Sequence, residues 1–383
     1  MKWNLVLFWL LGQLTSGCMG GLRVDSVATS VQKPSNVAVY VAVSKGEEPA
    51  LGLSEGAFHI FEDGQELSAK QSQQVLLPRD MVAVHRALLL VDMSGPVTEG
   101  DSRNAIALAV ARFVTKAHVS EPVTVYAFDG GASLKLIGDY PEGTDEIGEI
   151  PALSTYTPSD PSSNLHGAVM EALAQLDTRL MTAQKPLRIG SLVVFARGAD
   201  LAGRVTENKM REALSETKHL VFAIGIKDAP GFKASRIARD GAFEAESPAS
   251  LLASFDEAGT RVASVVGRYY LLAYCSPGRA GKRRLRIEVM TTDDKEKEVR
   301  GSMSAEIDTS GFTSGCDPTS RPQFVVSAPA KDAESTGEPD KEPTKTAKPA
   351  ANRPGAKPAP ETPGEKDEGD AVVPPPSKPG YAQ

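Results

Sequence analysis

The chain is poor in the residues and motifs on which most enzyme classes depend. Its 383 residues include only three cysteines and five histidines. It has no His-Glu-x-x-His metal motif, no Gly-x-Ser-x-Gly nucleophile turn and no glycine-rich phosphate loop of the usual spacing. The histidines are scattered along the chain, at His59, His85, His118, His166 and His219. The sequence therefore predicts a protein that is not an enzyme and that needs no cofactor.

The chain also lacks an excess of basic charge. Lys and Arg total 42 against 49 Asp and Glu, which gives a formal net charge of -7 at pH 7. Basic residues are interspersed with acidic ones, and the short cluster at 282–284 is typical of a solvated turn before a strand. A basic patch is the electrostatic signature of nucleic-acid binding. The sequence therefore predicts no nucleic-acid partner.

A long apolar run is missing as well. Lys2 is followed by a short apolar stretch at residues 5–11 and by small and polar residues up to Cys18. This stretch is too short for a membrane span and is typical of a secretory signal, here residues 1–17. Residues 14–18, Leu-Thr-Ser-Gly-Cys, resemble a bacterial lipobox, which implies cleavage before Cys18 and its lipidation. By the same resemblance, Met19 implies the outer membrane. The alternative is an ordinary secreted protein with an incidental cysteine.

The expected export to an oxidising compartment determines how the other two cysteines are interpreted. Cys275 and Cys316 form an even pair once Cys18 is set aside. An even number of cysteines in an exported chain predicts a disulfide bond. The alternative is two unrelated buried thiols.

Composition divides the mature chain into four zones. Residues 18–86 carry β-branched runs, and Asp63-Gly64 follows an apolar segment, which predicts a β-hairpin in a β-rich zone. Residues 87–266 alternate between strand and helix patterns. Residues 267–326 return to strands that can complete the N-terminal β domain. Residues 327–383 are rich in Pro, Lys, Glu, Ala and Gly without periodicity, which predicts a disordered tail.

The alternating zone predicts a parallel sheet with helices on both faces. Strands are expected at 87–91, 123–128, 133–137 (an edge strand), 189–195 and 220–226, and helices at 103–116, 165–180, 207–216 and 249–266. The apolar runs in 87–96, ALLLVDMSGP, and in 191–200, SLVVFARGAD, each end in a polar loop. Ligands of open α/β sheets bind at such strand ends.

These two loops resemble the metal-site loops of von Willebrand factor A domains, Asp-x-Ser-x-Ser and Thr-Asp-Gly. The resemblance implies a doubly wound, mostly parallel α/β sheet of Rossmann-like type. Carried over to this chain, the pattern keeps Asp92, Ser94 and a hydroxyl at Ser163, where Thr is usual. Pro96 replaces the second serine, and Arg197 replaces the last aspartate. The resemblance thus implies a degenerate metal-ion-dependent adhesion site.

The arginine is the more consequential of the two changes. A guanidinium cannot ligate a cation, so we expect no metal at this site. Arg197 beside Asp92 is expected to supply the positive charge that a metal would bring. Asp200, three residues after Arg197, is expected to be a surface residue.

The expected function is protein binding. We expect a lipid-anchored protein of the bacterial cell envelope that uses its A-like domain as a metal-independent binding or scaffold module. Its partner would be an envelope or extracellular protein. The segment 139–162 is the expected contact surface, because long loops at strand ends carry function.

Two alternatives remain open. One is an adhesion receptor in which Mg²⁺ is held by water, Asp92, Ser94, Ser163 and either Asp160 or Asp200. The other, more remote, is a hydrolase with a triad of Ser94, His166 and Asp92.

Overall fold

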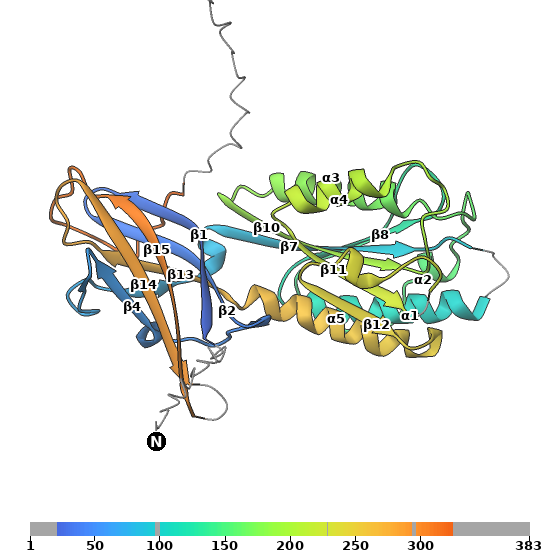
Figure 1. Cartoon of the computed structure of the whole chain (residues 1–383), viewed down its shortest axis with the longest axis horizontal. Helices are drawn as coiled ribbons and strands as arrows, with labels where there is room; N and C mark the ends of the chain where they lie inside the picture. Colours follow the sequence, from blue (N-terminus) through green and yellow to red (C-terminus); the bar gives the residue numbers. More distant parts are fainter. Residues whose placement is uncertain (1–20, 96–99, 228, 293–295, 325–383) are drawn as a thin grey trace, which may run out of the picture. The chain divides into compact units, whose positions relative to one another are not determined.

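The computed structural model describes residues 21–324, apart from 96–99, 228 and 293–295. These residues form an α/β body and a β-sandwich (Figure 1). The expected signal segment, Cys18, Pro96 and the expected tail lie outside the described residues. In the part of the chain that the structure describes, no helix is both long and apolar enough to cross a membrane.

The α/β body is built on a six-stranded sheet. Its strands lie in the order β12-β11-β10-β7-β8-β9, and all pairs are parallel except β8 with the edge strand β9. Read from β9, this is the doubly wound order 3-2-1-4-5-6, whose direction reverses between β7 and β10. The strands are β7 (Ala83–Asp92), β8 (Val123–Phe128), β9 (Lys135–Tyr140), β10 (Leu187–Ala196), β11 (Leu220–Ile226) and β12 (Gly241–Ala245).

Helices cover both faces of this sheet (Figure 1). They are α1 (Gly100–Ala117), α2 (Pro151–Ser154), α3 (Leu165–Met181), α4 (Glu207–Glu216) and α5 (Leu251–Val266). Leu89 and Val91 of β7 pack with α1 and α5, whereas Leu88 and Leu90 pack with α3 and α4. A strand that is buried on both faces has no solvent-exposed side, which explains the continuous apolar run of β7. The predicted doubly wound α/β fold is confirmed.

The β-sandwich combines strands from both ends of the described chain. Strand β13, which follows α5, pairs with β2, and β14 pairs with β4. One sheet has the order β1-β2-β13-β6 with β3 beside β2, and the other has the order β15-β14-β4-β5. Their facing sides bury Val39, Val41, Ile60 and Ile287. The chain thus leaves the sandwich after β6, forms the α/β body, and returns at β13.

The remaining elements belong to the sandwich or to connections. The sandwich strands are β1 (Leu22–Gln32), β2 (Asn36–Lys45), β3 (Glu48–Pro49), β4 (Phe58–Glu62), β5 (Gln65–Glu66), β6 (Val75–Leu77), β13 (Tyr269–Cys275), β14 (Lys282–Thr292) and β15 (Glu298–Asp308). Short 3-10 helices lie at Glu55–Ala57, Arg79–Met81, Ala234–Arg236 and Pro248–Ser250. Asp63 and Gly64 both have positive φ angles, 50° and 83°, in the tight turn between β4 and β5, as the hairpin signal predicts.

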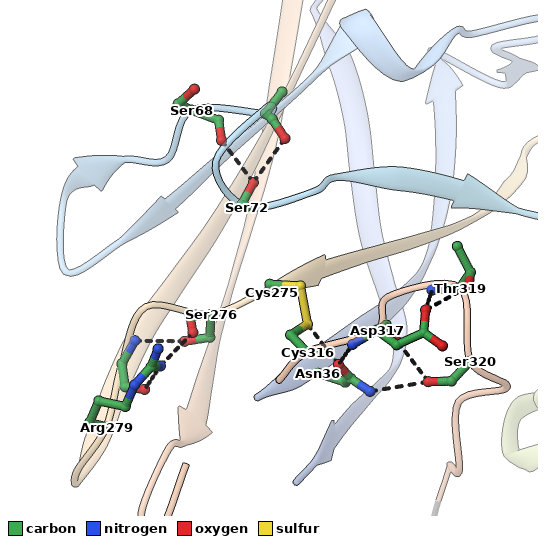
Figure 2. Close-up of a disulfide and its surroundings, with 12 residues drawn as sticks. Asn36, Ser68, Ser72, Cys275, Ser276, Arg279, Cys316, Asp317, Thr319 and Ser320 are labelled. Atoms are coloured by element: carbon green, nitrogen blue, oxygen red, sulfur yellow. Dashed lines mark hydrogen bonds between the residues drawn. A yellow bond between two sulfur atoms is a disulfide. The ribbon is translucent and has the colours of Figure 1, made fainter. Parts of the chain in front are cut away.

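The predicted disulfide joins Cys275, at the end of β13, to Cys316 (Figure 2). It closes a sequence separation of 41 residues. Asn36 at the start of β2 fixes the segment around it, because its Oδ1 accepts the Asp317 N–H at 3.0 Å and its Nδ2 donates to Ser320 Oγ at 3.1 Å (Figure 2). The disulfide therefore ties the segment after β15 to the strand pair β2–β13.

Sequence patterns miss several strands, among them β12 and β1, and they misplace the edge strand of the α/β body. Strand β12 is a short edge strand with mostly exposed or half-buried residues, so it carries little apolar signal. Strand β1 contains a bulge between Ser26 and Ala28, which breaks its alternation. The edge strand expected at 133–137 runs from Lys135 to Tyr140 instead, because its side chains are exposed or half-buried and its pairing with β8 sets its limits.

Candidate functional site

The predicted site residues lie where the strand order reverses. Asp92 ends β7, and Arg197 directly follows β10, its parallel neighbour. Asp129 directly follows β8 on the other side of β7. The carboxyl ends of parallel strands meet at one edge of a sheet, and the reversal opens a crevice there. We call the four segments that meet at this edge, 92–95, 129–131, 159–164 and 197–205, the loop face.

Asp92 is the buried centre of the loop face. Its side chain is 0% exposed, and each oxygen accepts a backbone N–H at 3.0 Å, Oδ1 from Ser94 and Oδ2 from Arg197. Burial raises the pKa of Asp92, whereas the Ser94 hydroxyl, the two amides and the Arg197 charge favour its ionised form. The carboxylate therefore serves to hold the ends of β7 and β10 together.

Arg197 brings its positive charge to this carboxylate. The side chain is half-buried, and Nη1 donates to the Ser94 carbonyl oxygen at 2.7 Å. Gly95 lies beneath the guanidinium with a φ of +93°, and a Cβ added there would stand 3.4 Å from Nη1. Glycine thus provides both the backbone conformation and the space that Arg197 needs. The arginine fixes the loop after β7 through its side chain and its backbone together.

Ser163 and Asn164 lie just before α3 and are almost fully buried, at 3% and 4% exposure. The Ser163 carbonyl oxygen accepts the N–H groups of Leu201 and Ala202. Among the described residues, Ser163 Oγ and Asn164 Oδ1 have no hydrogen-bond partner. An unpartnered buried oxygen is costly, so these two atoms are the polar atoms of the described loop face whose hydrogen bonding is incomplete.

Asp160 and Asp200 are already engaged within the chain. Asp160 Oδ1 accepts the Ser162 N–H at 2.9 Å and its hydroxyl at 2.7 Å, and these bonds lower the pKa of Asp160. Asp200 accepts the N–H of His166 at 2.8 Å and that of Gly203 at 2.8 Å. Its side chain is only 3% exposed, so the expectation of a surface residue is wrong. Asp200 caps the start of α3, where four N–H groups lack helical partners.

The residues of the loop face do not fit a divalent cation. Mg²⁺ requires a near-octahedral shell of oxygen ligands. Here both Asp92 oxygens accept backbone N–H groups, and Asp200 caps a helix. Arg197 places its own positive charge at the position where the metal-site pattern has its last acidic ligand. In the described ranges, no three His, Cys, Asp or Glu side chains are grouped so that they could hold a metal ion. Among the described residues of the loop face, the unpartnered Ser163 Oγ is an observation that favours a bound cation.

The geometry does not assemble the remote hydrolytic triad either. His166 Nδ1 lies 3.1 Å from the Val205 carbonyl oxygen and 3.5 Å from Asp200 Oδ2. Within the described residues, no hydrogen bond joins His166 to Ser94 or Asp92. A base must lie within hydrogen-bond reach of its nucleophile, so nothing here supports the triad.

Sequence reasoning overlooks Asp129. It is 4% exposed and accepts hydrogen bonds from the Tyr156 hydroxyl at 3.1 Å and from the backbone N–H groups of Gly131 and Ser159 at 2.6 and 2.7 Å. The signal was present, since an apolar strand pattern ends at Asp129-Gly130-Gly131 just as another ends at Asp92. Asp129 organises the second and third segments of the loop face.

Comparisons with known proteins give structural matches alone. No family model and no curated protein matches the chain. A von Willebrand factor type A structure from Catenulispora acidiphila is 12% identical over 75% of this chain and 73% of that one, with a TM-score of 0.39. Manganese-loaded TRAP from Plasmodium vivax is 14% identical over 63% and 98%, with a TM-score of 0.37.

Proximal thread matrix protein 1 from the mussel byssus, with a zinc-occupied MIDAS motif, is 13% identical over 53% of this chain, with a TM-score of 0.35. The chain spans about half of that mussel protein, 49%. These similarities concern the fold, which the strand order establishes independently. The strand order β12-β11-β10-β7-β8-β9 makes the α/β body a doubly wound sheet, which is the fold type that the resemblance to von Willebrand factor A domains implies.

Proposed function

We propose that this chain is a lipid-anchored protein of the bacterial cell envelope that binds another protein through its loop face, without a metal ion. The observation that carries the proposal is the arrangement of Asp92, Ser94 and Arg197. The guanidinium supplies a fixed positive charge and a hydrogen bond to the loop after β7. In a domain built in this way, the loops are fixed by hydrogen bonds of the chain's own side chains and not by a metal ion. Pre-organised loops on a rigid sheet are a common basis of recognition.

An exposed leucine supports the choice of a protein as the ligand. Leu201 lies on the loop face, four residues after Arg197, and is 74% exposed, the highest value among the described large apolar side chains that stand exposed. Arg204 lies three residues further on and is also exposed. Apolar side chains combined with arginine are typical of the centres of protein interfaces. A small-molecule site would instead be concave and enclosed.

Photo-crosslinking tests this function in the cell. With p-benzoylphenylalanine in place of Leu201, irradiation should give a covalent adduct with one partner protein, and treatment with EDTA should leave its yield unchanged. Met181, at the end of α3 and 67% exposed, is the matched control and should give no such adduct. Equal labelling from both positions, or loss of the Leu201 adduct in EDTA, would contradict metal-independent binding by the loop face.

A specific observation keeps the magnesium-dependent adhesion receptor as a second candidate. Ser163 Oγ is buried without a partner among the described residues, as expected of a hydroxyl that ligates a cation. Ser94 also stands at its ligand position. The two candidates differ in one measurable property, stoichiometric binding of a divalent cation.

The anchor is proposed from the N-terminal sequence. If Cys18 is lipidated, wild-type protein should partition into the detergent phase of a Triton X-114 separation. The Cys18→Ala variant should stay unprocessed or move to the aqueous phase, because several acyl chains give stable membrane attachment. Wild-type protein found mainly in the aqueous phase would overturn the anchor.

A further inference from the structure

We propose that two copies of this chain associate through β12, the outer strand of the α/β sheet, and form one continuous sheet about a two-fold axis. This inference goes beyond the proposed function, because it concerns a surface other than the loop face. It follows from the open backbone groups of β12, from the way this edge differs from the opposite one, and from the match of the strand to a second copy running in the reverse direction.

The outer edge of β12 presents backbone groups that the sheet does not use. Among the described residues, β12 pairs with β11 alone. The Ala245 carbonyl oxygen accepts the Lys227 N–H at 2.8 Å, so the backbone groups of Ala245 are directed toward β11. Because these directions alternate along a strand, Phe243 faces β11 as well. The N–H and C=O groups of Ala242 and Glu244 therefore face the open edge.

This edge lacks several features that commonly protect edge strands. Such strands often carry a lysine, a proline or a bulge. The opposite outer strand, β9, begins with the exposed Lys135, and its register with β8 shifts between Val125 and Tyr126. In contrast, the five residues of β12, Gly-Ala-Phe-Glu-Ala, keep a regular register with β11 and include neither lysine nor proline. The β12 edge is thus open to a further strand.

The open groups of β12 fit those of a second copy. They lie symmetrically on either side of Phe243. An antiparallel pair centred on this residue places Ala242 of one protomer opposite the partner's Glu244, and the reverse, and each of these two pairs exchanges both of its hydrogen bonds. The half-buried Phe243 then meets its counterpart in the close, non-hydrogen-bonded pair between them.

The charges of the strand allow this pairing. Glu244 comes opposite an alanine, so like charges do not meet within the strand. Asp240 and Glu246, just outside its two ends, come opposite each other across the pair. Asp240 forms an ion pair with Arg239 at 3.2 Å, and Glu246 forms one with Lys227 at 2.8 Å. Their charges are therefore offset within each protomer.

A groove beside β12 widens the contact. It has a volume of about 1070 Å³ and is lined by β12, by one flank of α5 and by Arg112 of α1. On this flank Leu252 is 50% exposed, and Ala249 and Ala253 are exposed too. Phe243 packs against the same core as α5. Two short paired strands are marginally stable by themselves, so this apolar flank supplies the further burial that a dimer needs.

The charged side chains of the groove are largely paired within the chain. Asp256 contacts Arg112, and Glu48 contacts Arg261. The other acidic residues of the α5 and hairpin walls are exposed to solvent, and they are Glu47 and Glu257. The groove therefore offers a second protomer its apolar flank and not a patch of unpaired charge.

The pairing determines where the two loop faces lie. The strands of the α/β sheet other than β9 run parallel to β12, and those of the second protomer run in the opposite direction. The two loop faces therefore lie at opposite edges of the joined sheet. A dimer of this kind can hold two ligand proteins at once, one at each edge.

Sedimentation velocity of the full mature chain from about 1 to about 100 µM tests the association. Every sample carries Cys18→Ala, so that neither an acyl chain nor a free thiol joins two copies. Wild type should shift from monomer to dimer as the concentration rises. Ala242→Pro removes an outward N–H and leaves the pairing with β11 intact, and it should weaken the dimer by about tenfold or more.

Leu252→Glu covers the case that the proline variant fails to fold, and it should weaken the dimer as well. Its matched control is Leu136→Glu, because Leu136 on the opposite edge strand β9 is 48% exposed. This control should dimerise within about twofold of wild type. A wild type that stays monomeric over the whole range, or equal weakening by the two glutamate variants, would overturn the inference.

Oxidative cross-linking tests the two-fold register. Phe243→Cys should form a disulfide between protomers, because the Cα atoms of a non-hydrogen-bonded pair lie about 4.5 Å apart. Ala242→Cys, which comes opposite the partner's Glu244 and not opposite its own counterpart, should cross-link far more slowly. Equal rates from the two positions would refute pairing centred on Phe243.

Discussion

The Glu121→Gln variant should be more stable than wild type at pH 9 and as stable as wild type near pH 4.5. Glu121 lies in the turn before β8 and is 1% exposed. No hydrogen bond of ordinary geometry reaches either of its carboxyl oxygens from the described residues. Burial therefore raises the pKa of Glu121 to about 8, although the Ser191 hydroxyl and the Arg86 charge nearby favour the ionised form.

The direction of the pH dependence follows from the difference in proton binding between the folded and the unfolded protein. The unfolded chain releases this proton near the ordinary value of 4.5, whereas the folded protein holds it until about pH 8. The folded state therefore binds more protons between these values, and the stability of wild type falls as the pH rises through this window. The full shift corresponds to about 5 kcal/mol above pH 8. We expect a gain of about 3 kcal/mol for glutamine, because Arg86 loses its counter-charge.

Urea unfolding between pH 4.5 and pH 9 measures this difference. Glu216→Gln is the matched control, because Glu216 at the end of α4 is exposed and should leave the pH dependence of wild type unchanged. A Glu121→Gln variant with the same pH slope as wild type would show that Glu121 is ionised in the folded protein at neutral pH.

Removal of the disulfide should have the other large effect on stability. The Cys275→Ala, Cys316→Ala double variant should lose about 4 kcal/mol of unfolding free energy, since the bond closes a loop of 41 residues in the unfolded chain. The loss should appear in the sandwich, where Cys275 ends β13 and the segment around Cys316 is held to Asn36.

Urea unfolding of the double variant, compared with wild type in the oxidised and reduced states, tests this expectation. Reduced wild type should match the variant, because both lack the same constraint. A difference of less than about 1 kcal/mol between oxidised and reduced wild type would contradict a stabilising role for this bond.

The parts of the fold that sequence predicts well are those with one dominant physical cause. Strands β7 and β10 are buried on both faces, so their apolar runs had a single interpretation. Strand β12 is an exposed edge, where pairing with β11 and not burial determines the structure. Local patterns carry little information about such pairing, and β12 was missed for that reason.

The candidate site shows the same division. Asp92, Ser94 and Arg197 were found because they lie in two loops that follow strong strand signals and resemble the metal-site loops of von Willebrand factor A domains. The roles of Asp200 and Arg204 were not, because their partners, His166 and Gly130, are 34 and 74 residues away in the chain. Only the folded sheet brings these loops to one edge. From sequence alone, a carboxylate in a loop is expected to be a surface residue, because the N–H groups that it caps are revealed only by the fold.

Isothermal titration of the mature protein with Mg²⁺, Mn²⁺ and Ca²⁺ tests the central claim, that Arg197 stands in for a metal ion, most directly. Wild type should show no stoichiometric binding of any of the three, and EDTA should not change its unfolding free energy. Arg197→Asp combined with Pro96→Ser restores two ligand positions and should gain measurable cation binding. One-to-one binding of Mg²⁺ by wild type, lost in Asp92→Ala, would contradict the account and favour the adhesion receptor.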